Sequence, residues 1–301
     1  MKSKILLVTA WMFLIAITVI SCKKEASDQN TKVSEDAAIT MSEETTEAEA
    51  DDDDVTELGL SVGADLEVAD TSEEPAAPNT ADGFKTGIRI ELFVDLAFKI
   101  GPCTKIDISP RGNVYPKTVT IDYGDGCVCF DGKFRKGAVI LVFSAPIRRP
   151  GAVLTISLRD FYVNRKHIEG VKTIKNLTEN SAIKYSVQVE GGKISFPNGR
   201  GFTVDRIKTV SQVRGMDTRT IRDDVYEIVG RSKISYANGL TIIKNTETPL
   251  VKKVTCAWIS QGILKIVIND RTLYLDFGNG DCDNKAILTW SNNGKREITL
   301  P

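Results

Sequence analysis

The chain has 301 residues, with 39 Lys and Arg against 40 Asp and Glu, which gives a formal net charge of −1. It contains six cysteines and a single histidine, His167 in a basic turn. One histidine disfavours Ser-His-Asp and Cys-His catalysis, which need a base beside the nucleophile, and it also disfavours a histidine-based zinc site.

The first 21 residues predict an export signal. Lys2 and Lys4 precede an uncharged, mainly apolar stretch at 5–20, which is the order found in secretory signal peptides. This stretch of 16 residues is shorter than the roughly 20 residues that span a bilayer as a helix. An uncleaved membrane helix is the alternative, but the charged Lys23-Lys24-Glu25 that follows disfavours it.

Cys22 is the predicted site of lipid attachment. The segment Val19-Ile20-Ser21-Cys22 resembles the lipobox of bacterial lipoproteins. That resemblance implies a diacylated thiol, cleavage of the signal before the cysteine, and acylation of the new amino group. Several acyl chains anchor a protein stably where one does not, so a membrane is the first predicted partner.

Residues 22–82 are predicted to be the lipidated cysteine and a disordered acidic linker. Residues 23–80 hold 18 acidic and 3 basic residues, a net charge of −15, and no Trp, Tyr or Phe. High net charge with low hydrophobicity leaves too little apolar surface to offset the entropy of ordering. We therefore expect a self-repelling tether that ends near Pro75 and Pro78.

The remainder of the chain is strongly basic. Because the whole chain carries −1 and the export signal +2, residues 81–301 carry +12. A basic body outside the cytoplasm could bind anionic glycan or lipid head groups. No basic motif interleaved with aromatic residues indicates specific nucleic-acid binding. The simpler alternative is that the charge serves solubility and a weak attraction to the acidic linker.

Residues 83–301 read as an antiparallel β domain, because apolar and polar residues alternate with a period of two and no helical stripe interrupts them. Asp-Gly and Asn-Gly pairs at 131–132, 198–199, 238–239 and 293–294 are typical of tight hairpin turns. The clearest predicted strands are 88–100, 118–123, 139–143, 153–158, 183–189, 203–207, 264–268 and 297–300. We expect an all-β meander that forms one large twisted sheet or a sandwich; periodicity does not choose between them.

An internal repeat covers about 103–143 and 256–290. Each copy contains a cysteine, a strand, a turn, a second strand, an Asp-aromatic-Gly-x-Gly motif, another cysteine and a Lys-containing turn into an apolar strand. The two cysteines are 24 residues apart in the first copy and 26 in the second.

The cysteines of the repeat predict two disulfides. Export places them in an oxidising compartment, and cysteines at the open ends of a hairpin face each other. We predict Cys103–Cys127 and Cys256–Cys282, each worth about 3 kcal/mol of stability from the entropy of the closed loop. Cys129 is then the odd thiol, although a Cys103–Cys129 bond is the alternative. A zinc site is disfavoured because no Cys-x-x-Cys pair is present.

Most of residues 100–301 resembles an uncharacterised class of Bacteroidota cell-envelope lipoproteins. The residues that carry the resemblance are Ile121-Asp122-Tyr123-Gly124-Asp125-Gly126-Cys127, Asp131-Gly132-Lys133, Arg135-Lys136-Gly137, Tyr162-Val163-Asn164, Glu169-Gly170, Thr248-Pro249-Leu250, Cys256-Ala257-Trp258-Ile259 and Asp276-Phe277-Gly278-Asn279-Gly280-Asp281-Cys282-Asp283. The resemblance implies an outer-membrane or surface location and no particular activity. Cys129 departs from the pattern, in agreement with its role as the odd thiol.

A calcium site is a further hypothesis. Asp276, Asn279, Asp281 and Asp283 surround the second repeat turn, and the last three have the alternating spacing of a calcium loop but lack its later bidentate Glu. The alternative is that these side chains accept hydrogen bonds from the turn backbone. No other metal and no organic cofactor is predicted.

We expect a non-enzymatic binding or structural module of the outer membrane, with its orientation toward the surface or the periplasm left open. Lys23-Lys24-Glu25 loosely resembles a charged surface-export tag of this phylum. One alternative is an envelope carrier whose open sheet shelters a lipid or glycolipid. A second alternative is a glycan hydrolase, which would need two carboxylates about 5–10 Å apart in a cleft.

Overall fold

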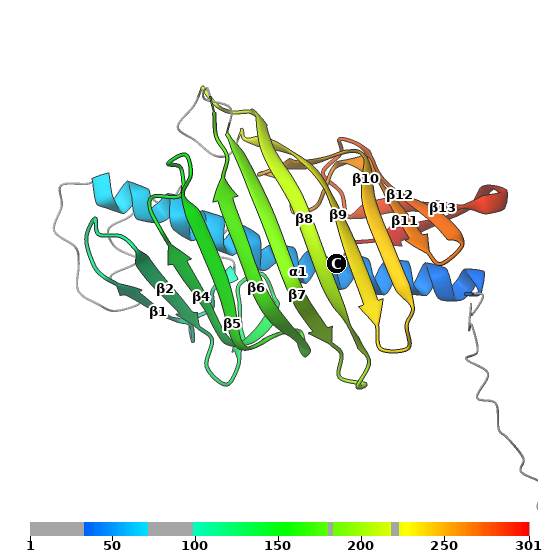
Figure 1. The fold of residues 1–301 in the computed structure, drawn as a ribbon, viewed down its shortest axis with the longest axis horizontal. Coiled ribbons are helices and arrows are strands. Elements are labelled where there is room, and N and C mark those ends of the chain that lie inside the picture. The colour runs from blue at the N-terminus through cyan, green and yellow to red at the C-terminus, as the bar shows by residue number, and fades with distance from the viewer. Residues whose placement is uncertain (1–32, 72–98, 180–182, 218–222, 301) are drawn as a thin grey trace, which may run out of the picture. The chain divides into compact units, whose positions relative to one another are not determined.

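The computed structural model describes residues 33–71, 99–179, 183–217 and 223–300. They form one long helix and one sheet (Figure 1). The helix is α1 (Glu35–Thr71). The strands are β1 (Lys105–Ser109), β2 (Lys117–Asp122), β3 (Cys127–Val128), β4 (Phe134–Phe143), β5 (Val153–Val163), β6 (Lys166–Asn176), β7 (Lys184–Ser195), β8 (Gly201–Arg214), β9 (Val225–Tyr236), β10 (Thr241–Lys253), β11 (Gln261–Ile268), β12 (Arg271–Asn279), β13 (Lys285–Trp290) and β14 (Gly294–Thr299). The short 3-10 helix η1 (Ser291–Asn293) precedes the last strand.

The strands form a single antiparallel meander. Each strand pairs with its neighbours in sequence from β1 to β14, except that β3 lies off the path and pairs with β4. Hairpins close at the predicted turns; at Asn198-Gly199, for example, the Gly199 N–H donates to the Phe196 carbonyl at 3.0 Å and Gly199 has a φ of +78°. The all-β prediction is confirmed, and of the two expected arrangements the chain adopts the single open sheet.

Part of the predicted organisation lies outside the described residues. The export signal, Cys22 and the linker residues 23–32 and 72–82 belong to this part, as does most of the strand predicted at 88–100. At the end of that predicted strand, Lys99 and Ile100 are described and do not belong to a strand. The other predicted strands are present as β2, β4, β5, β7, β8, β11 and β14.

The prediction of a disordered linker over 22–82 is wrong for Glu35–Thr71, which form α1. The helix contains 14 acidic residues and no Lys or Arg. Repulsion between these like charges would therefore unfold the helix if it were isolated from the sheet. Its buried side chains recur every three or four residues, at the helical period. They include Ala38, Ile39, Ser42, Thr45, Ala48, Asp52, Val55, Leu58, Val62 and Leu66. Packing of this stripe on the sheet therefore stabilises α1.

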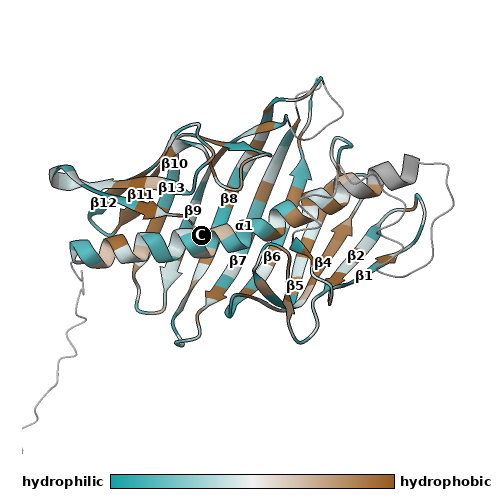
Figure 2. Cartoon of the chain, turned by 180° about the vertical axis from the view of Figure 1, so that it is seen from behind, coloured by the Kyte–Doolittle hydropathy of each residue, from teal (hydrophilic) through white to brown (hydrophobic). Residues whose placement is uncertain are grey.

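α1 lies across one face of the sheet and crosses its strands (Figures 1 and 2). Neighbouring strands are about 4.8 Å apart and one helical turn advances about 5.4 Å. A helix that crosses the strands therefore presents about one turn to each strand. This match allows a residue on the buried stripe of α1 to meet each successive strand.

Two disulfides, Cys103–Cys127 and Cys256–Cys282, link the ends of the repeat copies. Both are the pairings that the sequence predicts. The two copies also share a turn bond, in which Oδ1 of Asp122 or Asp276 accepts from the glycine N–H two residues later, at 2.8 and 2.9 Å.

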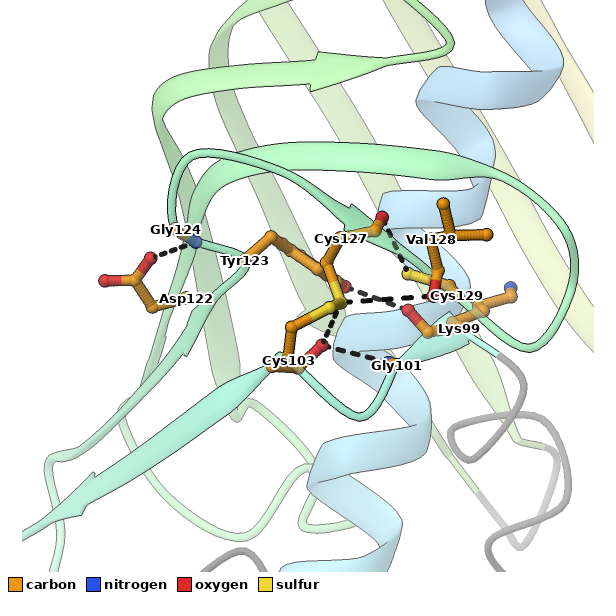
Figure 3. Close-up of a disulfide and its surroundings, with 10 residues drawn as sticks. Lys99, Gly101, Cys103, Asp122, Tyr123, Gly124, Cys127, Val128 and Cys129 are labelled. Carbon is orange, nitrogen blue, oxygen red and sulfur yellow. Dashed lines mark hydrogen bonds between the residues drawn. A yellow bond between two sulfur atoms is a disulfide. The ribbon is translucent and has the colours of Figure 1, made fainter.

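Cys129 is buried as a free thiol close to the first disulfide (Figure 3). Its Sγ donates to the Cys127 carbonyl at 3.8 Å. Burial raises the pKa of this thiol, which makes it a poor nucleophile.

Candidate binding face beneath helix α1

A continuous row of side chains crosses the sheet on the face that α1 covers. The strand registers align one residue from each strand of the path, and the row ends at Gly294 of β14. From β1 to β13 this central row consists of Ile108, Val119, Leu141, Ile156, Lys172, Val189, Arg206, Ser232, Lys244, Ile266, Leu273 and Trp290. The row is apolar at both ends, and its middle, Lys172 to Lys244, is the basic segment.

At the β1 end, α1 packs very closely on the apolar part of the row. A Cβ added to Gly59 would lie 2.9 Å from the Ile156 side chain. At Gly63 it would lie 2.7 and 2.8 Å from the side chains of Ile147 and Phe143. Glycine costs up to about 1 kcal/mol relative to Ala inside a helix. The two glycines let the helix backbone approach the sheet, which is a local reason for their presence in α1.

In the basic segment, Asp52 of α1 joins two buried cations. Its carboxylate accepts hydrogen bonds from Lys172 on β6 and from Arg206 on β8. These three side chains are at most 7 % exposed. Asp53 lies 3.0 Å from Arg206 and 2.6 Å from Lys208 on β8.

Glu49, about one helical turn before Asp52 and Asp53, makes a similar contact with the basic segment. Its Oε2 accepts a hydrogen bond from Lys244 of β10 at 2.5 Å, and Lys244 also donates to Thr46 at 3.2 Å. The acidic residues of α1 therefore follow the basic residues of the row from β6 to β10. Figure 2 shows the hydrophilic middle of the helix over these strands.

Further cations surround the basic segment. Lys166 lies 2.5 Å from Glu47 and 2.7 Å from Asp51, and Lys133 lies 2.9 Å from Asp51 and 2.5 Å from Asp54. Every acidic residue of α1 from 43 to 57 forms an ion pair with a Lys or Arg outside the helix. The weak attraction to the linker that the net charges suggested is thus a specific set of contacts.

The cations lower the pKa values of two acidic residues of α1, Asp53 and Glu57. Burial alone would raise the pKa of Asp53, but Arg206 and Lys208 outweigh burial and hold this pKa well below its usual range. Burial is outweighed in the same way at Glu57, where Lys99 and Lys252 lower the pKa to about 2.

The buried lysines show the opposite balance. Burial lowers the pKa of Lys172, and the nearby Arg206 lowers it further, although Asp52 partly compensates. The pKa of Lys244 is also lowered by burial, despite its ion pair with Glu49. Charge on these two lysines is therefore costly, and α1 compensates it only in part.

Some polar groups near the basic segment remain unsatisfied. Within the described part of the chain, the buried Nε of Arg206 and the buried hydroxyl of Tyr236 have no hydrogen-bond partner. Unpaired buried donors of this kind cost about 1–3 kcal/mol each. In this arrangement α1 therefore leaves these two donors without an acceptor, although the helix itself has a buried oxygen without a hydrogen bond, Oγ1 of Thr56.

The predicted calcium residues do not form such a site. Asp276 and Asp283 each accept a hydrogen bond from the backbone N–H two residues later, at 2.9 and 3.0 Å, while Asn279 ends β12 and Asp281 is exposed. Among the described residues, no group of three or more His, Cys, Asp and Glu is placed to hold a metal ion. The turn-type alternative describes Asp276 and Asp283.

An open depression of about 440 Å³ lies beside α1 and is lined by Thr40, Glu43, Glu44, Glu47, Asn164, Lys166 and Phe196. All three of its carboxylates are already ion-paired: Glu43 to Arg296 at 3.5 Å, Glu44 to Arg200 at 2.6 Å and Glu47 to Lys166 at 2.5 Å. The geometry therefore gives no support to a glycosidase acid–base pair here.

Comparison with family models, curated proteins and solved structures finds no match for this chain. Among the described residues, no helix is both long and apolar enough to cross a membrane.

The sequence did not predict that α1 covers a basic row of the sheet, although signals for this packing were present. The small and apolar residues of α1 recur at the helical period, and the acidic charge of the linker opposes the basic charge of the domain. The alignment of Lys172, Arg206 and Lys244 depends on the bulges and hairpin lengths between them. No local sequence pattern predicts that these three residues lie in register across the sheet.

Proposed function

We propose that the mature chain is a lipid-anchored, non-enzymatic binding module of the outer membrane, and that it binds anionic ligands through the basic segment. One observation carries the binding role: Lys172, Arg206 and Lys244 lie in register on one face of an open sheet. The anchor is supported by the lipobox at Cys22.

The physical argument concerns the cost of burying these cations. Replacing a buried ion pair by well-packed apolar residues is often neutral or stabilising. A sheet that only had to hold a helix would be served by an apolar row along its whole length, as at its two ends. Buried cations in the middle are expected where a surface must recognise an anion.

Cell fractionation with labelled palmitate tests the anchor. The wild-type chain is expected in the membrane fraction with the label, and Cys22→Ser is expected to lose both. Protease shaving of intact and lysed cells then assigns the orientation. A Cys22→Ser chain that still fractionates with membranes and carries label would contradict the lipoprotein part of the proposal.

Titration with inorganic polyphosphate tests anion binding in the Cys22→Ser chain. We expect binding that a Lys166→Gln/Lys208→Gln double variant weakens, because these cations flank the basic segment and are less buried than Lys172. Equal binding by the variant, or no binding by either chain, would contradict the proposed site.

A further inference from the structure

The pattern of α1 is complementary to that of the central row. The helix is apolar where it crosses β4 and β5, with Gly59 against Ile156, and apolar again near Ala38, which lies beside Leu273 of β12. Between these regions it carries the acidic residues 43–57. The helix therefore covers the central row with an anionic middle and two apolar ends.

The sheet face beneath α1 requires a ligand that is anionic in its middle and apolar at its ends. Without α1, the apolar residues Leu141, Ile156, Ile266 and Leu273, all fully buried now, would face water. Apolar burial contributes roughly 25 cal/mol per Å², so a purely hydrophilic polyanion could not replace the helix along the whole row. An amphiphile could cover both the basic segment and the apolar ends.

Unsatisfied donors point to the chemistry of the anionic part. Arg206 offers its buried Nε without an acceptor, and Tyr236 offers its hydroxyl. A phosphate group presents several acceptor oxygens and is bound by Arg in a forked geometry. The carboxylate of Asp52 already shares its two oxygens between Lys172 and Arg206.

We infer that the face beneath α1 is a site for an anionic phospholipid, and that α1 is its intramolecular competitor. The phosphate lies over Lys172, Arg206 and Lys244, and the acyl chains follow the apolar ends of the row. Lipid entry displaces the acidic middle of α1 from the cations. This inference rests on the proposed anion-binding function and names its ligand class.

Competition between α1 and the lipid predicts a pattern of variant effects on lipid binding that a purely structural role of α1 does not predict. Each ion pair between α1 and the sheet can be removed by neutralising either its acidic residue on the helix or its basic residue on the sheet. Neutralising the helix side weakens only the competitor, so lipid binding should rise. Neutralising cations on the sheet side also removes positive charge that attracts the lipid phosphate, so lipid binding should fall.

The experiment uses the full mature chain with Cys22→Ser, so that the anchor does not itself bind vesicles. The chain is incubated with vesicles of phosphatidylglycerol and phosphatidylcholine, or of phosphatidylcholine alone, and is then separated by gel filtration. Mass spectrometry counts each lipid bound per protein. The helix-side variant is Glu47→Gln/Asp53→Asn and the sheet-side variant is Lys166→Gln/Lys208→Gln, which neutralise partners of the same ion pairs.

Because these pairs include partly exposed side chains, both variants are expected to fold, and circular dichroism checks this. Single variants Asp53→Asn and Lys208→Gln replace a double variant that does not fold. Up to about 1 kcal/mol for an exposed pair corresponds to about a fivefold change in binding.

Selective retention of phosphatidylglycerol, raised by the helix-side variant and lowered by the sheet-side variant, is the expected result. Changes in the same direction in both variants, or no retained lipid in any chain, would overturn the inference. If polyphosphate binds while lipid does not, the proposed function survives and only the lipid assignment fails. Loss of both would remove both proposals.

Discussion

Among the acidic residues of α1, removal of Asp52 is expected to cause the largest loss in the free energy of unfolding. It neutralises two cations, Lys172 and Arg206, that are themselves buried. Removal of one member of a buried ion pair costs about 3–5 kcal/mol because the partner's charge is left uncompensated. We predict a loss of this size in the free energy of unfolding for Asp52→Ala, measured by urea denaturation.

Glu44→Ala provides the matched control. Glu44 of α1 also pairs with an arginine outside the helix, but the side chain of this partner, Arg200, is 62 % exposed. Exposed pairs contribute about 0–1 kcal/mol. A loss for Glu44→Ala equal to that for Asp52→Ala would show that burial of the cations does not determine the effect.

Gly63 is predicted to be intolerant of a side chain despite its position in a helix. Its Cβ would lie 2.7 Å from Ile147 and 2.8 Å from Phe143. Overpacking of this kind typically costs about 1–3 kcal/mol and should exceed the gain in helix propensity. Gly63→Val should therefore lower the urea midpoint, whereas Ser61→Ala, at a partly exposed position, should leave it unchanged or raise it slightly.

Cys129 should be unreactive in the folded protein. Its side chain is buried and its thiol pKa is raised by that burial, so little thiolate forms at neutral pH. Without reductant, iodoacetamide should add one group to the Cys22→Ser chain in denaturant and none in native buffer, as read by intact mass. Fast labelling of the native chain would contradict the buried position.

The disulfides and the odd thiol were predictable because each depends on nearby sequence. Cysteines at the two ends of a hairpin determine each other's position through a loop of 24 or 26 residues. The role of Asp52 could not be predicted in this way. Its partners, Lys172 and Arg206, are 120 and 154 residues away, and only the assembled sheet places them together.

At the scale of the element, α1 should respond to acid. Glu57 has a pKa lowered from 4.5 to about 2 by Lys99 and Lys252, against the effect of burial, and the pKa of Asp53 is lowered in the same sense by Arg206 and Lys208. The unfolded chain then binds more protons than the folded chain in this range. The stabilisation is complete above the unfolded pKa and is lost as the pH falls from about 4.5 toward 2.

Urea midpoints measured between neutral pH and the acid limit test this prediction. We expect a decline in that window and a shallower decline in Glu57→Gln, which removes one of the titrating groups. An identical pH profile in the variant would assign the acid sensitivity to other residues.

The strands and the helix differ in how far sequence determines them. Alternation along β2, β5 and β8 is a local property and predicted each strand. Acidic residues 51–54 of α1 indicate disorder for an isolated segment, since like charges repel. They become favourable only opposite the basic segment, so the helix is a consequence of tertiary structure.

For the whole molecule, the disulfides should add stability near both ends of the open sheet. Cys103 precedes β1, and Cys256–Cys282 encloses β11 and β12. We predict that Cys256→Ser/Cys282→Ser loses about 3 kcal/mol of unfolding free energy through loss of the closed loop. Denaturation with and without reductant measures this. Cys129→Ser leaves both disulfides in place and should therefore show the same difference between the two conditions as the wild-type chain.

The long range of the α1 contacts has a consequence for the order of assembly. Glu49 meets Lys244 across 195 residues of sequence, and Val33, just before the start of α1, meets Arg271 across 238. The helix is synthesised first, yet its neutralising partners are completed near the end of the chain. An acidic segment without those partners repels itself, so α1 can fold only after the sheet exists. The first described element of the protein is therefore the last to reach its final place.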